Sequence, residues 1–219
     1  MEQKTFALKG NIIYTKERTR FEVMEQGWLV CEEGRVRDVY SVLPEELKGI
    51  PVEDMGDRLI IPGLTDLHIH APQYTFRSLG MDMELLEWLE TNTFPEESKY
   101  KDAEYAQKAY GMFAEQLKKS ATVRACIFGT IHNEATLILM DLLEEAGLHT
   151  MVGKVNMDRN SPDYLCEPSA EASAQATREW LKAVADRKYK HTRPILTPRF
   201  TPSCTDELME LLKEIQTET

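Results

Sequence analysis

The first 58 residues form short apolar segments separated by turn residues, a pattern typical of β-strands. Glu33-Gly34 lies between two of these segments and predicts a hairpin turn. So few short strands would not form a stable domain alone, so they predict a small β-module. The strand-like segments cover residues 6–14, 27–31, 36–42 and 52–55.

From Arg58 onward, strand-like segments alternate with longer segments of helical periodicity. The predicted strands cover residues 59–70, 122–130, 150–157 and 194–200. They are apolar on both faces, as parallel strands covered by helices must be. Such alternation predicts parallel strands joined by crossover helices.

Four helices are predicted between and after these strands. The apolar positions of the first recur at three- and four-residue intervals, as in an amphipathic helix. Asn133 is predicted to cap the second helix, and Gly147 to end it in the left-handed conformation. The third carries Ala172, Ala176 and Trp180 on its apolar stripe. The predicted helices cover residues 102–119, 133–146, 169–186 and 205–219.

These elements predict an α/β fold in which four βα units are visible. Four units are half of a (β/α)8 TIM-type barrel, whose usual length is ~250 residues. A four-unit open sheet is the alternative, and the order of elements alone does not choose between them. We place the boundary between the β-module and the βα units after Arg58, giving residues 1–58 and 59–219.

The charge balance and the absence of long apolar runs limit the partners of the protein. The 219 residues carry a formal net charge of -11, which opposes binding to nucleic acid phosphates. No apolar run approaches the ~20 residues that span a bilayer, and the N-terminus lacks the apolar segment of a signal peptide. We therefore predict a cytoplasmic protein that binds neither nucleic acid nor membranes.

The cysteines support the same compartment. Cys31, Cys126, Cys166 and Cys204 are far apart in the sequence and form no C-x-x-C pair. This spacing does not indicate disulfides or a cysteine zinc site. We predict reduced thiols, most of them buried.

The strongest candidate for chemistry is the end of the strand predicted at residues 59–70. Alternate residues of a strand share a face, so Asp66, His68 and His70 should point the same way. Two imidazoles at the C-terminal end of a strand can ligate one metal ion, and active sites of barrels form at that end. Asp66, one step deeper, could hold an imidazole N–H and fix its tautomer. Two partly exposed histidines without a metal are the alternative.

The residues Pro62-Gly63-Leu64-Thr65-Asp66-Leu67-His68-Ile69-His70 resemble the first-strand motif of the amidohydrolase superfamily of metal-dependent hydrolases. Residues 1–58 resemble the N-terminal part of the small β-sandwich in those enzymes, and residues 59–219 the first half of their barrel. Further motifs along the whole chain are similar to the guanine deaminase family. They are His68-Ile69-His70-Ala71-Pro72-Gln73-Tyr74, Leu85-Leu86-Glu87-Trp88-Leu89, Thr93-Phe94-Pro95, Phe128-Gly129-Thr130-Ile131-His132, Gly153-Lys154-Val155 with Met157-Asp158, and Thr197-Pro198-Arg199-Phe200-Thr201.

The resemblance implies zinc-dependent hydrolysis of guanine to xanthine and ammonia in purine catabolism. It implies that His68 and His70 bind zinc, which lowers the pKa of bound water. It also implies that Gln73, Arg199 and Phe200 contact guanine. An amide both donates and accepts hydrogen bonds, a guanidinium presents a rigid fork of donors, and a phenyl ring supplies an apolar wall.

The resemblance further implies groups that this sequence does not contain. The family carries a metal ligand and the acid–base glutamate on a fifth strand, and a histidine and an aspartate on later strands. His132, His149 and His191 do not match those positions. We therefore expect this chain to be the N-terminal portion of such an enzyme and inactive alone. The exposed edge of its half-barrel would favour association, for example as a homodimer.

Without the resemblance, each candidate has a simpler interpretation. Gln73 would bond backbone in a loop, Arg199 would as readily pair with a carboxylate, and Phe200 would lie in the core. Trp88 and Phe94 are predicted to pack within the first βα connection. Asp158 and Tyr164 are weak candidates for a lid over the pocket.

Two other functions remain open at this point. One is another nucleobase or nucleoside deaminase of the superfamily, against which the motifs Ala71-Pro72-Gln73 and Pro198-Arg199-Phe200 argue. The other is a non-catalytic truncated product, or a half-barrel that pairs with another chain.

Overall fold

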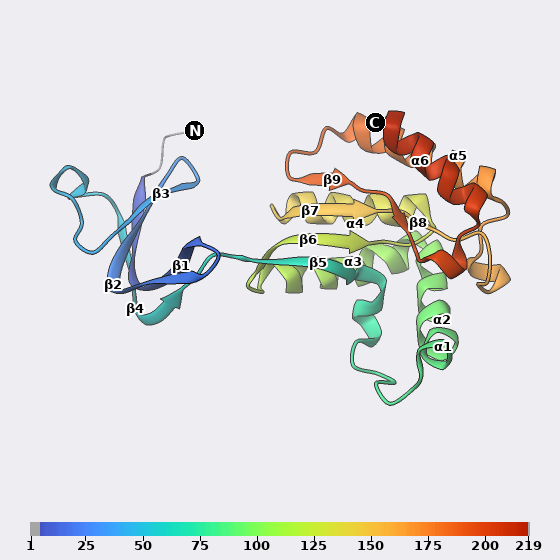
Figure 1. Ribbon diagram of the computed structural model, residues 1–219, viewed down its shortest axis with the longest axis horizontal. Helices are drawn as coiled ribbons and strands as arrows, with labels where there is room; N and C mark the ends of the chain where they lie inside the picture. Colours follow the sequence, from blue (N-terminus) through green and yellow to red (C-terminus); the bar gives the residue numbers. More distant parts are fainter. Residues whose placement is uncertain (1–4, 219) are drawn as a thin grey trace. The chain divides into compact units, whose positions relative to one another are not determined.

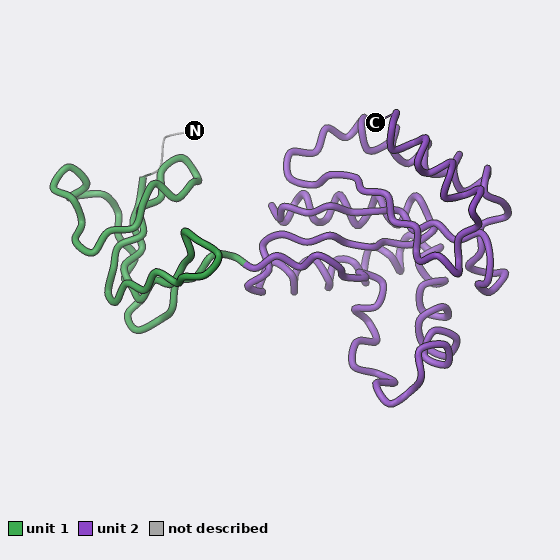
Figure 2. Tube along the Cα trace, in the orientation of Figure 1, with its two compact units in different colours: residues 1–63 green, residues 64–219 purple. Residues whose placement is uncertain are grey.

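The computed structural model describes residues 5–218 and divides the chain into two compact units, residues 1–63 and residues 64–219 (Figure 2). The division falls between Gly63 and Leu64, whereas the sequence placed it after Arg58. Among the described residues, no helix combines the length and the apolar character that crossing a membrane requires.

The first unit is a four-stranded sheet in the order β3-β2-β1-β4. Its strands are β1 (Phe6–Glu17), β2 (Arg20–Glu32), β3 (Arg35–Tyr40) and β4 (Val52–Ile60), with the 3₁₀ helix η1 (Glu45–Leu47) before β4. β1 pairs with β2 antiparallel and with β4 parallel. Glu33 and Gly34 join β2 to β3 with φ of 52° and 75°. This confirms the predicted hairpin, since two-residue loops favour positive φ at both positions.

The second unit is built on a parallel sheet in the order β5-β6-β7-β9 (Figure 1). Its strands are β5 (Leu64–His70), β6 (Thr122–Phe128), β7 (His149–Gly153) and β9 (Thr192–Pro194). A short parallel pair, β8 (Val155–Asn156) and β10 (Thr197–Pro198), continues the chain beyond β7 and β9. The carboxyl ends of the parallel strands therefore lie at one edge of the sheet, where βα connections can form a site.

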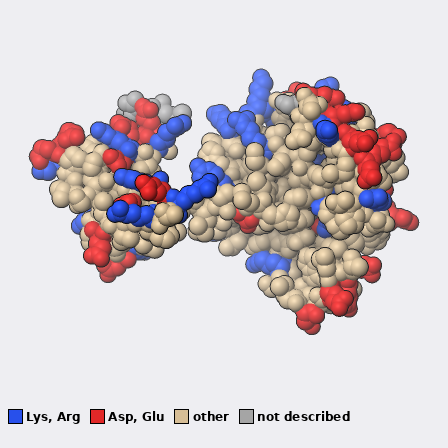
Figure 3. All heavy atoms as spheres, viewed as in Figure 1, with Lys and Arg blue, Asp and Glu red and all other residues tan. Residues whose placement is uncertain are grey.

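Four long helices connect or follow the strands: α3 (Ala103–Lys118), α4 (Asn133–Glu145), α5 (Ala170–Arg187) and α6 (Asp206–Glu218). The main core joins apolar side chains of α3 and α4 to those of β6 and β7, with Trp180 of α5. A second core cluster joins α5 to α6. Acidic side chains gather over α6, which exposes Asp206, Glu207, Glu210, Glu214 and Glu218 (Figure 3).

The connection from β5 to α3 is a chain of short helical turns. They are η2 (Ala71–Phe76), α1 (Leu85–Trp88), the π-helical turn η3 (Leu89–Thr93), α2 (Phe94–Ser98) and the 3₁₀ turn η4 (Lys99–Lys101). Asp102 then caps α3 by accepting hydrogen bonds from the main-chain N–H groups of Glu104 and Tyr105. This cap explains why α3 begins where the sequence predicted.

Three predicted strands are broken in the structure. The strand expected at residues 59–70 is interrupted at Ile61-Pro62-Gly63, because a proline has no N–H for a ladder. The strand at residues 150–157 is interrupted at Lys154, and the strand at residues 194–200 at residues 195–196. β2 and β4 are longer than predicted, since β2 begins at Arg20 and β4 reaches Ile60.

Three smaller predictions were wrong. His132, not Asn133, is the residue before the first turn of α4, because the Asn133 amide instead donates to the main-chain oxygen of Ala176 at 2.8 Å. Ala172 of the predicted stripe is exposed, while Ser173 on the neighbouring face is buried. All four cysteines are free, but only Cys204 is buried.

Candidate active site

Strand β5 ends on two histidines that lie side by side. The ring centroids of His68 and His70 are 5.0 Å apart, with an interplanar angle of 69°. Phe128, at the end of the adjacent strand β6, lies against both rings at 4.9 and 4.6 Å. The pairing of His70 with Phe128 in the parallel ladder places all three at the C-terminal edge of the sheet.

The histidine pair fits a metal ion as two of its ligands. His70 Nδ1 is buried and has no hydrogen-bond partner among the described residues. Burial, together with the charges of Arg199 and His68, lowers the pKa of His70 to about 3. The imidazole is therefore neutral, which is the form that ligates metals. The described residues hold no group of three or more His, Cys, Asp or Glu that could complete such a site.

Asp66 makes a different contact from the one predicted. Its Oδ1 accepts a hydrogen bond from the main-chain N–H of His68 at 3.0 Å. The sequence predicted that this carboxylate would hold an imidazole N–H instead. In the structure it fixes the backbone that leads into His68.

A pocket of about 550 Å³ opens beside the histidine pair. It brings together all of the residues predicted to bind metal or guanine, namely His68, His70, Gln73, Arg199 and Phe200. Trp88, which was predicted only to pack, also lines it. None of the remaining lining residues was predicted to bind metal or guanine: Ile69, Tyr74, Arg77, Leu85, Leu89 and Phe113.

Gln73 reaches the pocket because the chain turns immediately after β5. Helix η2 begins at Ala71 and has Pro72 in its first turn, where a missing N–H costs nothing. Tyr100 Oη donates to the main-chain oxygen of Pro72 at 3.2 Å and anchors this turn. Gln73 is thereby held three residues after the second histidine, at the same edge of the sheet.

Arg199 follows β10 and is fixed by its backbone and its side chain. Its main-chain N–H donates to Asn156 O at 3.2 Å. Its Nη1 donates to Glu97 Oε2 at 2.5 Å, and its guanidinium lies 5.4 Å from the ring of Phe94. Burial raises the pKa of the Glu97 carboxyl, and the charge of Arg199 opposes the rise. The next residue, Phe200, keeps 37% of its surface exposed.

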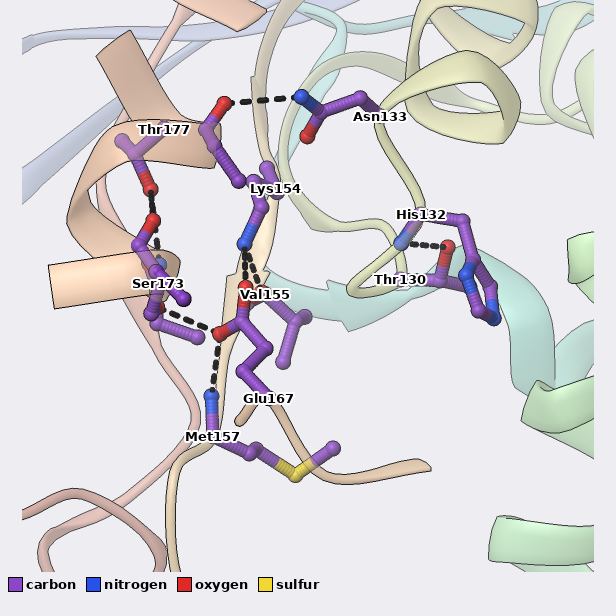
Figure 4. A network of polar contacts seen from close by, with 12 residues as sticks. Thr130, His132, Asn133, Lys154, Val155, Met157, Glu167, Ser173 and Thr177 are labelled. Atoms are coloured by element: carbon purple, nitrogen blue, oxygen red, sulfur yellow. Dashed lines mark hydrogen bonds and ion pairs between the residues drawn. The ribbon is translucent and has the colours of Figure 1, made fainter. Parts of the chain in front are cut away.

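A buried polar network supports the backbone that carries Arg199 (Figure 4). Lys154 Nζ donates to Glu167 Oε1 at 2.5 Å, and the second oxygen of Glu167 accepts from the main-chain N–H of Met157 and from Ser173 Oγ. Burial lowers the pKa of Lys154, and Glu167 opposes this. Because the network fixes residues on both sides of Asn156, it also fixes the main-chain oxygen that holds Arg199.

The other polar candidates lie outside the pocket. His132 is half-buried, and burial with the charges of Lys101 and Lys154 lowers its pKa to about 4. Asp158 accepts from the main-chain N–H of Thr205 at 2.8 Å, so it anchors the start of α6 and does not cover the pocket. Tyr164 is exposed and does not line the pocket.

The sequence analysis missed Glu97, the carboxylate that holds Arg199. A signal for it was present, since Phe94, Glu97 and Tyr100 are spaced by three residues and therefore share one helical face. Phe94 and Tyr100 are both apolar enough to be buried, and all three are buried in the structure. A carboxylate on such a face requires a cationic partner.

Comparisons with known proteins agree on one family. The model of the Amidohydrolase family matches residues 59–218. Guanine deaminase of Dictyostelium discoideum is 36% identical over 227 residues, which cover 96% of this chain and 50% of that protein. Guanine deaminase of Escherichia coli (strain K12) is 34% identical over 203 residues, which cover 89% of this chain and 44% of that protein.

A solved structure is similar throughout the chain. The crystal structure of guanine deaminase from C. acetobutylicum with bound guanine in the active site matches with a TM-score of 0.91 and 42% identity. The match covers 98% of this chain and 51% of that one. The chain thus spans about half the length of the relatives it matches.

Proposed function

Because the chain belongs to the amidohydrolase family, we propose that a protein carrying it hydrolyses guanine to xanthine and ammonia. The observation that supports this most is the single pocket that holds both the histidine pair and the two polar side chains suited to a purine, Gln73 and Arg199. Similar proteins named guanine deaminase, one with guanine bound, support the choice of substrate.

Zinc is the proposed cofactor, with His68 and His70 as two of its ligands. When bound, the ion would supply a hydroxide at neutral pH by lowering the pKa of its water. The neutral imidazole of His70, with its buried and unpartnered Nδ1, suits this role. Phe128 limits the positions of both rings by packing against them.

Gln73, Arg199 and Phe200 would bind and orient the base. A guanidinium can donate two parallel hydrogen bonds to a carbonyl oxygen and an adjacent ring nitrogen. Gln73 can both donate and accept, as the edge of guanine requires. The ring of Phe200 and the apolar side chains of Leu85 and Trp88 would exclude water and strengthen these polar contacts.

The remaining catalytic groups are proposed to come from other residues. By the family resemblance, the four βα units form half of a (β/α)8 barrel, and the acid–base glutamate belongs to a fifth strand. Loss of such a group commonly lowers rates by ~10²–10⁴-fold. We therefore expect the isolated 219-residue chain to bind guanine but to deaminate it poorly. The wider context we propose is a cytoplasmic enzyme of purine catabolism that associates as a homodimer.

The second candidate is another nucleobase deaminase of the family. An adenine-type substrate lacks the carbonyl that the donors of Arg199 would recognise, so the composition of the pocket favours guanine. The two candidates differ in which base the pocket prefers.

Fluorescence titration tests the proposal, because Trp88 lines the pocket. The 219-residue chain should bind guanine more tightly than adenine. Arg199→Ala should weaken guanine binding by about tenfold or more, through loss of a charge-assisted hydrogen bond. Arg193→Ala, in the exposed part of β9, is the matched control and should leave binding unchanged. Equal affinity for both bases, or an unchanged affinity in Arg199→Ala, would contradict the proposed function.

A further inference from the structure

Glu97 is a buried carboxylate just outside the pocket lining. Its side chain is 1% exposed and that of Arg199 is 4% exposed. Its Oε2 accepts from Arg199 Nη1 at 2.5 Å. No other ion pair with Arg199 occurs among residues 5–218. The guanidinium therefore has one carboxylate partner, and that partner comes from α2, far away in the sequence.

The same carboxylate lies close to Gln73. Its second oxygen, Oε1, is buried without a well-formed hydrogen bond among the described residues, and the Gln73 side chain is near enough to help lower the pKa of Glu97. Glu97 therefore lies next to Arg199 and close to Gln73, the two polar side chains that the proposed function assigns to base binding.

Within the described part of the chain, the pocket lining contains no acidic residue. Its charged lining residues are Arg77 and Arg199. Arg77 is exposed, stacks 4.1 Å from the ring of Tyr74 and donates to that residue's main-chain oxygen. Arg199 is always protonated and is buried, so its charge acts in a low dielectric. Without Glu97, the inner end of the pocket would be cationic.

We propose that Glu97 is a positioning and specificity residue of this pocket. It holds the Arg199 fork in one arrangement, and it cancels the charge of Arg199 so that the pocket selects a neutral purine over an anionic one. This inference rests on the proposed function for the identity of the base, but the ordering of Arg199 by Glu97 can be measured without guanine.

Glu96, the neighbouring carboxylate, provides a matched control. It accepts hydrogen bonds from Thr75 Oγ1 at 2.6 Å and from Lys99 Nζ at 2.6 Å, and it also bonds Tyr105. Among residues 5–218, Glu96 forms no hydrogen bond or ion pair with Arg199, and it does not line the pocket. Comparing Glu96→Gln with Glu97→Gln therefore separates the general effect of losing a carboxylate in α2 from the specific effect of losing Glu97.

The test compares Glu97→Gln with Glu96→Gln in the 219-residue chain. Guanine is the neutral probe, and urate, an anion at neutral pH, is the charged one; both are titrated by fluorescence. Glu97→Gln should weaken guanine binding and strengthen urate binding by about tenfold each. In ¹H–¹⁵N spectra of the arginine side chains, the separate Nη signals of Arg199 should merge, because its rotation is no longer blocked. Glu96→Gln should change neither result.

Glu97→Gln keeps the shape of the side chain, and circular dichroism checks its fold. A second comparison adds Glu97→Gln to Arg199→Gln. Without the Arg199 charge, burial keeps the Glu97 carboxyl protonated and neutral, so the added Glu97→Gln should leave the preference between guanine and urate constant. The proposal is overturned if Glu97→Gln leaves both the preference for guanine over urate and the Arg199 signals unchanged. It is also overturned if Glu97→Gln shifts that preference as much in the Arg199→Gln background as in the wild-type chain. If the wild-type chain binds no guanine, yet Glu97→Gln gains urate binding and frees Arg199, the proposed function fails and the role of Glu97 stands.

Discussion

His70 is the residue whose surroundings bear most directly on metal binding. Its unpartnered Nδ1 and its low pKa leave a neutral nitrogen available at neutral pH. We expect His70→Ala to lower the zinc affinity of the chain by about 100-fold or more, because a ligand is lost outright. Competition with a chromophoric chelator measures this. His149→Ala is the control, since His149 packs against His191 and lies outside the pocket. An equal loss in both variants would argue against a site on β5.

Lys154 and Glu167 form a buried ion pair whose separation should be costly. Lys154 is fully buried, and Glu167 is 8% exposed. Lys154→Met leaves the Glu167 charge buried without its partner, so the free energy of unfolding should fall by about 3–5 kcal/mol. Urea denaturation measures the change.

The double variant Lys154→Met/Glu167→Gln should recover part of that loss, because no uncompensated charge remains. Lys213→Met, on the exposed side of α6, should have little effect. A small loss in Lys154→Met would mean that water reaches the network in Figure 4.

The sequence predicted site residues that stand in motifs and missed Glu97, which supports one of them. His68, His70, Gln73 and Arg199 stand in motifs of recognisable spacing, and the structure brings them to one pocket. Glu97 stands in no such motif, because its role depends on a partner about a hundred positions away. Pairing over such a distance follows from the fold and is not visible in local spacing.

Glu144 joins two secondary-structure elements, the last turn of α4 and the start of β9. Its carboxylate accepts from the main-chain N–H groups of Lys190, His191 and Thr192 at 2.7, 2.9 and 2.9 Å. Burial opposes ionisation, but the three N–H groups hold the pKa of Glu144 below its usual value. A lowered carboxyl pKa stabilises the fold above the unfolded-state pKa, and this contribution is lost as the pH falls through the folded-state value.

Glu144→Gln should therefore lower the free energy of unfolding at neutral pH, by about 1.5–3 kcal/mol. The difference from wild type should shrink at acidic pH, where Glu144 itself becomes protonated. Urea denaturation at several pH values measures both effects, with the exposed neighbour Glu145→Gln as the control. A difference that stayed constant with pH would show that the negative charge is not what Glu144 contributes.

Helices were easier to predict than strands for a physical reason. The period of apolar residues in α3 spans several turns, so its ends were predicted within one residue. By contrast, β8 and β10 are only two residues long, and β9 is three. Lys154, which separates β7 from β8, forms a buried ion pair with Glu167 that an apolar pattern does not reveal. The predicted alternation of strand and helix, and with it the α/β fold of the amidohydrolase family, was nevertheless correct.

For the whole molecule, the two units should differ in stability. Among residues 5–63, few apolar side chains are buried: Ala7, Ile12, Val30 and Leu47. The second unit contains the other core clusters. Since apolar burial drives folding, amides of β1 and β2 should exchange with deuterium faster than those of β6 and β7. Mass spectrometry of peptic fragments measures this, and equal protection would show that the units unfold together.

The π-helical turn at Leu89–Thr93 bears on how the length of this region can vary. A π turn holds about one residue more than an α turn, so losing one residue here would yield a regular α-helix with both flanks still in register. Losing one residue within 94–97 would instead rotate Glu97 by about 100° and point it away from Arg199. Natural insertions and deletions in this stretch should therefore collect in the π turn and spare the four residues that follow it.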